Sequence, residues 1–141
     1  MKISSKEITE IAQELESGFK IYINCDTLEF KAIFDYKDTF GDTEIWEEEQ
    51  EKIEKEWENY IIINKMESWE AFKIMEEFTY EVKDERMQED LTKILNRKSP
   101  FANFKFEIED SEYREQWFKF RTKKYEDFTK EKLELEEIEF E

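Results

Sequence analysis

The chain has 141 residues, with 39 Asp and Glu against 22 Lys and Arg, a net charge of −17, and 16% aromatic residues. Disordered acidic chains are poor in aromatic side chains, so this composition predicts a folded domain with a densely charged exterior. The chain has no histidine, one cysteine, two glycines and one proline. These counts exclude imidazole-based catalysis, an internal disulfide, a cysteine-cluster metal site and a glycine-rich phosphate loop.

The first predicted element is a helix over Ser5–Glu16, because residues 4–7 match a capping box and apolar residues follow at helical spacing. The runs 19–24 and 28–34 alternate between apolar and polar side chains around a short turn, which predicts a β-hairpin. Residues 60–64 are rich in isoleucine and predict a third strand.

Two charged segments lie between the hairpin and the third strand. Residues 35–44 are expected to be a polar connector, since their carboxylates do not follow the spacing of a calcium loop. Residues 44–60 are predicted to form an acidic helix with a narrow apolar stripe. Its acidic face has three interpretations: a solvated surface, a mimic of the nucleic-acid phosphates that occupies the basic groove of a protein, or a surface that attracts a basic partner.

From residue 68 onward the sequence predicts helices. Ser68, Asp84, Ser99 and Ser111 are the expected N-caps, and Pro100 suits a first helical turn. Apolar residues follow the caps and predict an aromatic core: Trp69, Phe72, Met75, Phe78, Thr79, Val82, Met87, Leu91, Ile94, Leu95, Phe101, Phe104, Ile108, Tyr113, Trp117, Phe120 and Phe128.

The predicted fold is therefore α+β, with an N-terminal helix, a small antiparallel sheet made of the hairpin and a third strand, and a helical C-terminal half. Residues 1–141 are expected to form a single domain, in which 133–141 are an acidic tail. The first residues lack a secretory signal, and no apolar run is long enough for a membrane span, so we expect a cytoplasmic protein.

Three short motifs stand out in the helical half of the chain. The pattern M-x-x-F falls on Met75 and Phe78, and R-x-x-W-x-x-F falls on Arg114, Trp117 and Phe120. A third pattern, R-x-x-F-x-x-F-K, is matched with one extra residue after the arginine, on Arg97, Phe101, Phe104 and Lys105. With these motifs the chain resembles an uncharacterised family of small bacterial proteins. The resemblance implies a bacterial intracellular α+β domain and implies no activity, substrate or site residue.

Residues 97–132 combine aromatic and basic side chains and carry a net charge of +2, against −14 for residues 1–96. They can form an aromatic core covered by the stems of Lys and Arg, or a surface on which nucleic-acid bases stack. Helical spacing favours the core for most of the rings. A candidate contact surface remains, made of rings off the main stripe and three arginines: Phe106, Phe118, Tyr125, Arg97, Arg114 and Arg121.

The sequence favours a non-enzymatic intracellular interaction or regulatory module whose acidic face contacts a basic protein partner. The alternative is a nucleic-acid-associated protein that uses residues 97–125. A carboxylate-based enzyme is a third option, because 39 acidic residues offer many pairs and nothing selects one of them. No catalytic, cofactor-binding or metal-binding residue is identified, and no cofactor is expected.

Overall fold

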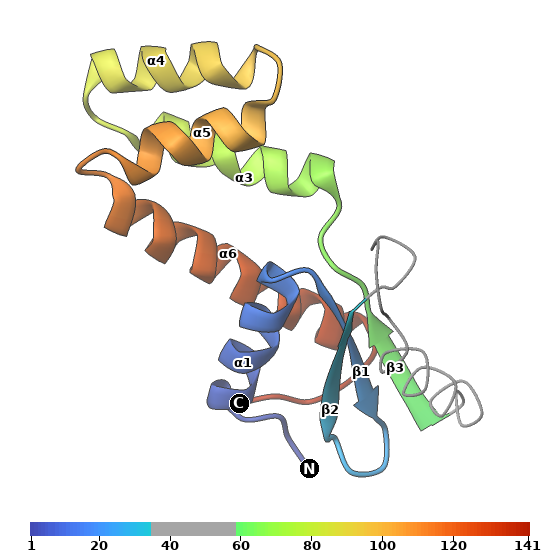
Figure 1. Ribbon diagram of the computed structural model, residues 1–141. Helices are drawn as coiled ribbons and strands as arrows, with labels where there is room; N and C mark the ends of the chain where they lie inside the picture. The colour runs from blue at the N-terminus through green and yellow to red at the C-terminus, as the bar shows by residue number, and fades with distance from the viewer. Residues whose placement is uncertain (35–58) are drawn as a thin grey trace. The chain divides into compact units, whose positions relative to one another are not determined.

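The computed structural model describes residues 1–34 and 59–141 (Figure 1). The predicted connector and nearly all of the predicted acidic helix lie outside the described residues. The chain divides into two compact units, which are described separately below. The first unit contains Met1–Lys65 and Tyr125–Glu141, and the second contains Met66–Lys124. This division does not decide the expectation of a single domain, which stays a prediction.

The first unit begins with helix α1, Ser5–Glu16, which has the predicted bounds. The Ser4 hydroxyl accepts a hydrogen bond from the Glu7 backbone N–H at 3.2 Å, and the Glu7 carboxylate accepts one from the Ser4 N–H at 3.3 Å. This reciprocal capping box satisfies donors that the first helical turn leaves free. The chain leaves the helix at Gly18, whose φ of +97° is a conformation that favours glycine.

Strands β1 (Phe19–Asn24), β2 (Phe30–Phe34) and β3 (Tyr60–Ile63) form an antiparallel sheet in the order β2-β1-β3. The central strand places Ile21 opposite Ala32 on one side and Ile63 on the other. Helix α1 packs against β1. The predicted hairpin and third strand are confirmed, and so is the α+β fold class.

Helix α6, Arg114–Leu135, contributes its last eleven residues to the first unit. Beyond this helix the backbone pairs with the N-terminus of the chain. The Ile3 N–H donates to the Glu139 carbonyl at 3.0 Å, and the Glu141 N–H donates to the Ile3 carbonyl at 2.9 Å. The Ile3 side chain is 1% exposed. The acidic C-terminal segment therefore has defined backbone partners on residue 3.

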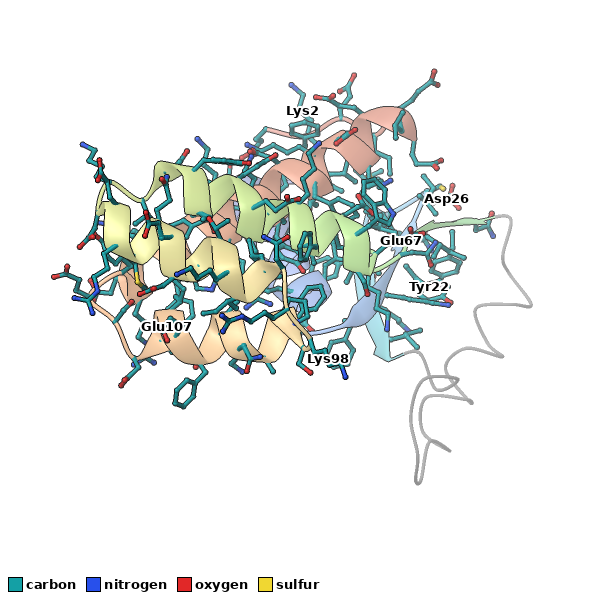
Figure 2. All side chains as sticks on the ribbon, turned by 90° about the horizontal axis from the view of Figure 1, so that it is seen from above. Lys2, Tyr22, Asp26, Glu67, Lys98 and Glu107 are labelled. Carbon is teal, nitrogen blue, oxygen red and sulfur yellow. The ribbon has the colours of Figure 1, made fainter. Side chains whose placement is uncertain are left out.

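The second unit contains helices α3 (Ser68–Glu81), α4 (Glu85–Leu95) and α5 (Pro100–Glu109) and the start of α6. Figure 2 shows Glu67 where α3 begins, and Lys98 and Glu107 towards opposite ends of α5. None of the helices in the described ranges is both long and apolar enough to cross a membrane.

The predicted caps of these helices are partly correct. The Asp84 carboxylate accepts hydrogen bonds from the backbone N–H groups of Arg86 and Met87, as a helix cap should. The cap of α3 is Glu67 rather than Ser68. Ser99 precedes α5 but has a left-handed backbone, with a φ of 53°, and its side chain makes no capping bond. Ser99 therefore occupies the predicted cap position, with Pro100 in the first turn as expected, but without the capping hydrogen bond, which a side chain makes from an extended backbone.

The aromatic core of the second unit joins three helices. The Phe78 ring of α3 lies 5.2 Å from the Trp117 ring of α6, and the Phe104 ring of α5 lies 5.0 Å from the same indole. Trp69 was expected on the buried side of α3, but it is 64% exposed. It precedes Phe78 by nine residues, or two and a half helical turns, so the two side chains point in opposite directions.

Candidate functional site

The predicted contact residues on α6 include one close pair. The Arg114 guanidinium lies over the Phe118 ring, 5.4 Å from its centroid, which is the distance of a cation–π contact. Arg121 follows Phe118 by three residues, so it lies on the same side of the helix. Arg114 is exposed, and Phe118 and Arg121 are half-buried. These three residues form one continuous strip along the helix.

The other predicted contact residues do not join this strip. Phe106 lies on α5 and is 75% exposed, and Arg97 is exposed just beyond the end of α4. Among the described residues, no ring contact connects Phe106 with Phe118. No ring contact between the described residues thus joins Phe106 to the strip, and the single contact surface stays a prediction.

Tyr125 was predicted to be exposed, but it is 6% exposed and belongs to the first unit. Phe128 and Thr129 follow it by three and four residues and are also buried. Such spacing places all three on one side of α6. The prediction is wrong because the buried face of the C-terminal part of this helix is wider than the line of Trp117 and Phe128, and it includes Tyr125 and Thr129.

An exposed row of side chains that was not predicted from the sequence runs along α3. We call it the outer stripe and define it as Trp69, Lys73, Glu76 and Tyr80, which are all exposed. Their spacing of four, three and four residues keeps them on one side of the helix. The Trp69 indole N–H donates to the Glu67 carboxylate at 2.6 Å, which fixes the ring. The helical spacing of the sequence could have revealed this stripe, because its four positions lie on the side of α3 that faces away from the line of buried residues.

The first unit contains an open, shallow surface cavity of about 520 Å³ beside its C-terminal segment. We call it the acidic cavity. Its lining combines apolar side chains, one thiol and three carboxylates: Met1, Cys25, Leu28, Ile61, Ile138, Glu136, Glu137 and Glu139. The three glutamates are exposed, and no basic residue is among those that line the cavity. No sequence pattern predicted this site, because its residues come from four separate parts of the chain.

Two residues of the cavity have an unusual backbone. Leu28 has a φ of 61° and Glu137 a φ of 59°, both in the left-handed region. Residues other than glycine adopt this conformation at a cost of about 1–3 kcal/mol, and such residues cluster at ligand sites and switch regions. In the hairpin turn, Asn24 helps to hold the strained loop, since its side-chain oxygen accepts from the N–H groups of Asp26 and Thr27. Local hydrogen bonds thus hold the hairpin-turn part of the lining.

These features define an α+β protein with an acidic cavity in one unit and an aromatic core in the other. The chain belongs to the Uncharacterised protein family (UPF0158), whose family model matches residues 26–141. The resemblance seen in the sequence patterns is therefore confirmed. No curated protein and no solved structure matches the chain.

Proposed function

We propose that the protein is a non-enzymatic intracellular interaction module whose acidic cavity binds a basic segment of a partner protein. The observation that carries this proposal is the combination of apolar and carboxylate side chains around one cavity. Lys and Arg side chains have an apolar stem and a charged end, and this lining offers a complementary group to each part.

The three carboxylates of the cavity are available to a partner. No hydrogen bond or ion pair engages the side chains of Glu136, Glu137 or Glu139 within the described residues. The alkyl stem of a bound Lys or Arg would pack on Leu28 and Ile61, while its charged end would meet these carboxylates. Charge-assisted hydrogen bonds of this kind are shorter and stronger than neutral ones.

The charge distribution along the chain supports the same choice of partner. The residues of the first unit include 25 Asp and Glu and 10 Lys and Arg, a net charge of −15. The residues of the second unit include 14 acidic and 12 basic side chains, a net charge of −2. A strongly negative unit attracts a basic partner from a distance and raises its association rate.

Catalysis is not part of the proposal. A carboxylate that acts as a general acid or base is usually shielded from solvent, because burial adjusts its proton affinity. Glu136, Glu137 and Glu139 are all exposed. Their position at the surface suits the recognition of a charged partner better than proton transfer.

The test is an affinity capture from lysate of the source cell with tagged full-length protein, with and without nuclease. The triple variant Glu136→Gln, Glu137→Gln and Glu139→Gln removes three charges from the cavity. A matched control removes three exposed charges from the second unit by the substitutions Glu81→Gln, Glu89→Gln and Glu112→Gln. We expect the wild type and the control to retain a basic protein after nuclease treatment. The amount of this protein captured by the cavity variant should be at least tenfold lower.

Two outcomes would contradict the proposal. Equal capture by the cavity variant and the control would remove the cavity from the binding site. Capture that disappears with nuclease would support instead the nucleic-acid alternative built on residues 97–125.

A further inference from the structure

We propose that the outer stripe of α3 is the contact surface of a two-fold symmetric dimer of this protein. The stripe lies within the second unit, so the inference is independent of the acidic cavity. It rests on the order of chemical types along the stripe, which reads aromatic, basic, acidic, aromatic: Trp69, Lys73, Glu76 and Tyr80.

This order is complementary to itself when two copies pack antiparallel. The stripe is symmetric about the midpoint between residues 74 and 75. A two-fold axis through that point places Lys73 opposite Glu76 of the partner subunit. The same axis places Trp69 opposite Tyr80 of the partner subunit. An isologous interface requires this kind of pairing, in which each contact occurs twice.

The dimensions of the stripe fit a helix–helix contact. Trp69 and Tyr80 are eleven residues apart, which corresponds to about 16 Å along the helix axis. Antiparallel helices that cross at about 20° stay in contact over such a length. The two aromatic residues would lie at the ends of the contact and the charged residues at its centre.

The stripe is exposed, while residues on both sides of it contact other helices of the same unit. Trp69 is 64% exposed and Tyr80 is 78% exposed. On one side, Phe72 of α3 contacts Phe101 of α5, with 6.4 Å between ring centroids. On the other side, Glu77 forms an ion pair of 2.6 Å with Lys124. Neighbouring helices thus engage both flanks of α3 and leave the stripe between them free.

The charged pair at the centre of the stripe is available for the contact. Lys73 and Glu76 are one helical turn apart, yet neither has an ion-pair partner among the described residues. The antiparallel arrangement would give each of them a partner of opposite charge. Exposed aromatic side chains at both ends supply the apolar area that hot spots in interfaces commonly use.

The net charge of −17 opposes self-association, but it is distributed unequally. The unit that carries the stripe has a net charge of only −2. At an ionic strength of 0.15 M, charges separated by more than about 8 Å are largely screened. The helix face is smaller than a standard protein interface, so we expect a weak dimer with a dissociation constant on the order of 10–100 μM.

The experiment is sedimentation equilibrium of the full chain at 0.15 M salt, over concentrations of about 10–300 μM that bracket this range. The single variants Lys73→Glu and Glu76→Lys each place like charges opposite one another twice. We expect each of them to raise the dissociation constant at least tenfold. The double variant Lys73→Glu with Glu76→Lys reverses both charges and recreates both pairs, so we expect its dissociation constant to return to within about threefold of the wild type.

The control variant is Lys93→Glu, which makes the same charge change at an exposed position of α4. It should follow the wild type apart from a small effect of net charge. Trp69→Ala should weaken the dimer without affecting the charge pairs. Circular dichroism verifies that every variant is folded, which is expected because the substituted side chains are exposed.

A wild-type chain that remains monomeric at 300 μM would overturn the proposal. So would a dimer that the single charge reversals leave unchanged, or one that the double variant does not restore. None of these results bears on the acidic cavity, so failure of the dimer and failure of the proposed function are distinguishable.

Discussion

The Phe104 ring lies edge-on to the Trp117 indole, with 5.0 Å between the ring centroids and an angle of 68° between the planes. This contact connects α5 with α6 in the second unit. Phe104 is 1% exposed and Trp117 is 6% exposed. Edge-to-face aromatic pairs contribute about 0.5–1.5 kcal/mol beyond their buried area. The pair is therefore expected to be central to the stability of this unit.

We expect Phe104→Ala to lower the free energy of unfolding by about 3–5 kcal/mol, because it leaves a cavity in the aromatic core. Phe106→Ala, two residues away on the same helix, is the matched control. Its ring is 75% exposed, so we expect a change within about 0.5 kcal/mol. Urea denaturation followed by circular dichroism measures both. Similar losses for the two variants would contradict the described packing of α5.

The pairing of the two chain ends gives a second prediction. Ile3→Ala removes a side chain that is 1% exposed, and should cost about 2–4 kcal/mol. Lys2→Ala is the control, since Lys2 is exposed. Hydrogen exchange should then quicken at the amides of Ile3 and Glu141, which both take part in the pairing. Slow exchange that persists at the Glu141 amide in the Ile3→Ala variant would contradict the described pairing of the two chain ends.

The cap of α4 can be tested by Asp84→Ala. The substitution removes an acceptor that serves the N–H groups of Arg86 and Met87, so we expect a loss of about 0.5–2 kcal/mol. Asp84→Asn keeps an acceptor oxygen and should retain most of the stability. If both variants behave like the wild type in urea denaturation, the cap does not contribute to the stability of the unit.

The left-handed backbone of Ser99 leads to the prediction that a substitution there does not lower stability. Ser99→Gly should leave stability unchanged or raise it by up to about 1 kcal/mol, because glycine adopts a positive φ without strain. Ser99→Ala should be neutral, since the Ser99 side chain makes no capping bond. A clear loss of stability for Ser99→Ala would indicate that its hydroxyl caps α5 after all. Thermal unfolding of the three proteins provides the comparison.

The ion pair between Glu77 and Lys124 should contribute little. The two side chains are 38% and 36% exposed, and exposed pairs contribute about 0–1 kcal/mol, less at high salt. Glu77→Gln should therefore cost no more than about 1 kcal/mol at low salt, with the difference shrinking in 1 M NaCl. A salt-independent loss of several kcal/mol would show that Glu77 acts through packing instead.

Local sequence patterns predicted much of the secondary structure. The capping box at residue 4 predicted where α1 begins, and the helical spacing of the isoleucines and leucine that follow predicted how far it extends. The alternating runs gave the hairpin and the third strand, because successive side chains of a strand point to opposite faces. Asp84 was also predicted correctly as a cap, because its carboxylate accepts from amides only two and three residues away. In each of these cases the interacting groups are close together in the chain.

The candidate sites could not be found in this way. The acidic cavity gathers Met1, Leu28, Ile61 and Glu137, and no local pattern relates these positions to one another. Trp69 and Tyr125 were placed on the wrong sides of their helices, because an apolar ring in a helix is compatible with either a core or a surface position. Ser99 matched the residue type of a cap but adopts a backbone conformation that prevents capping.

Within residues 1–34 and 59–141, the sequence by itself determined the type of each helix and strand and the bounds of several, because hydrogen bonds and side-chain periodicity within a helix or strand depend on neighbouring residues. Only the tertiary structure decided which rings are buried, which stripe of α3 stays uncovered and which carboxylates surround a cavity. Burial depends on the area that one element covers on another, and that area is set by contacts between residues distant in the chain.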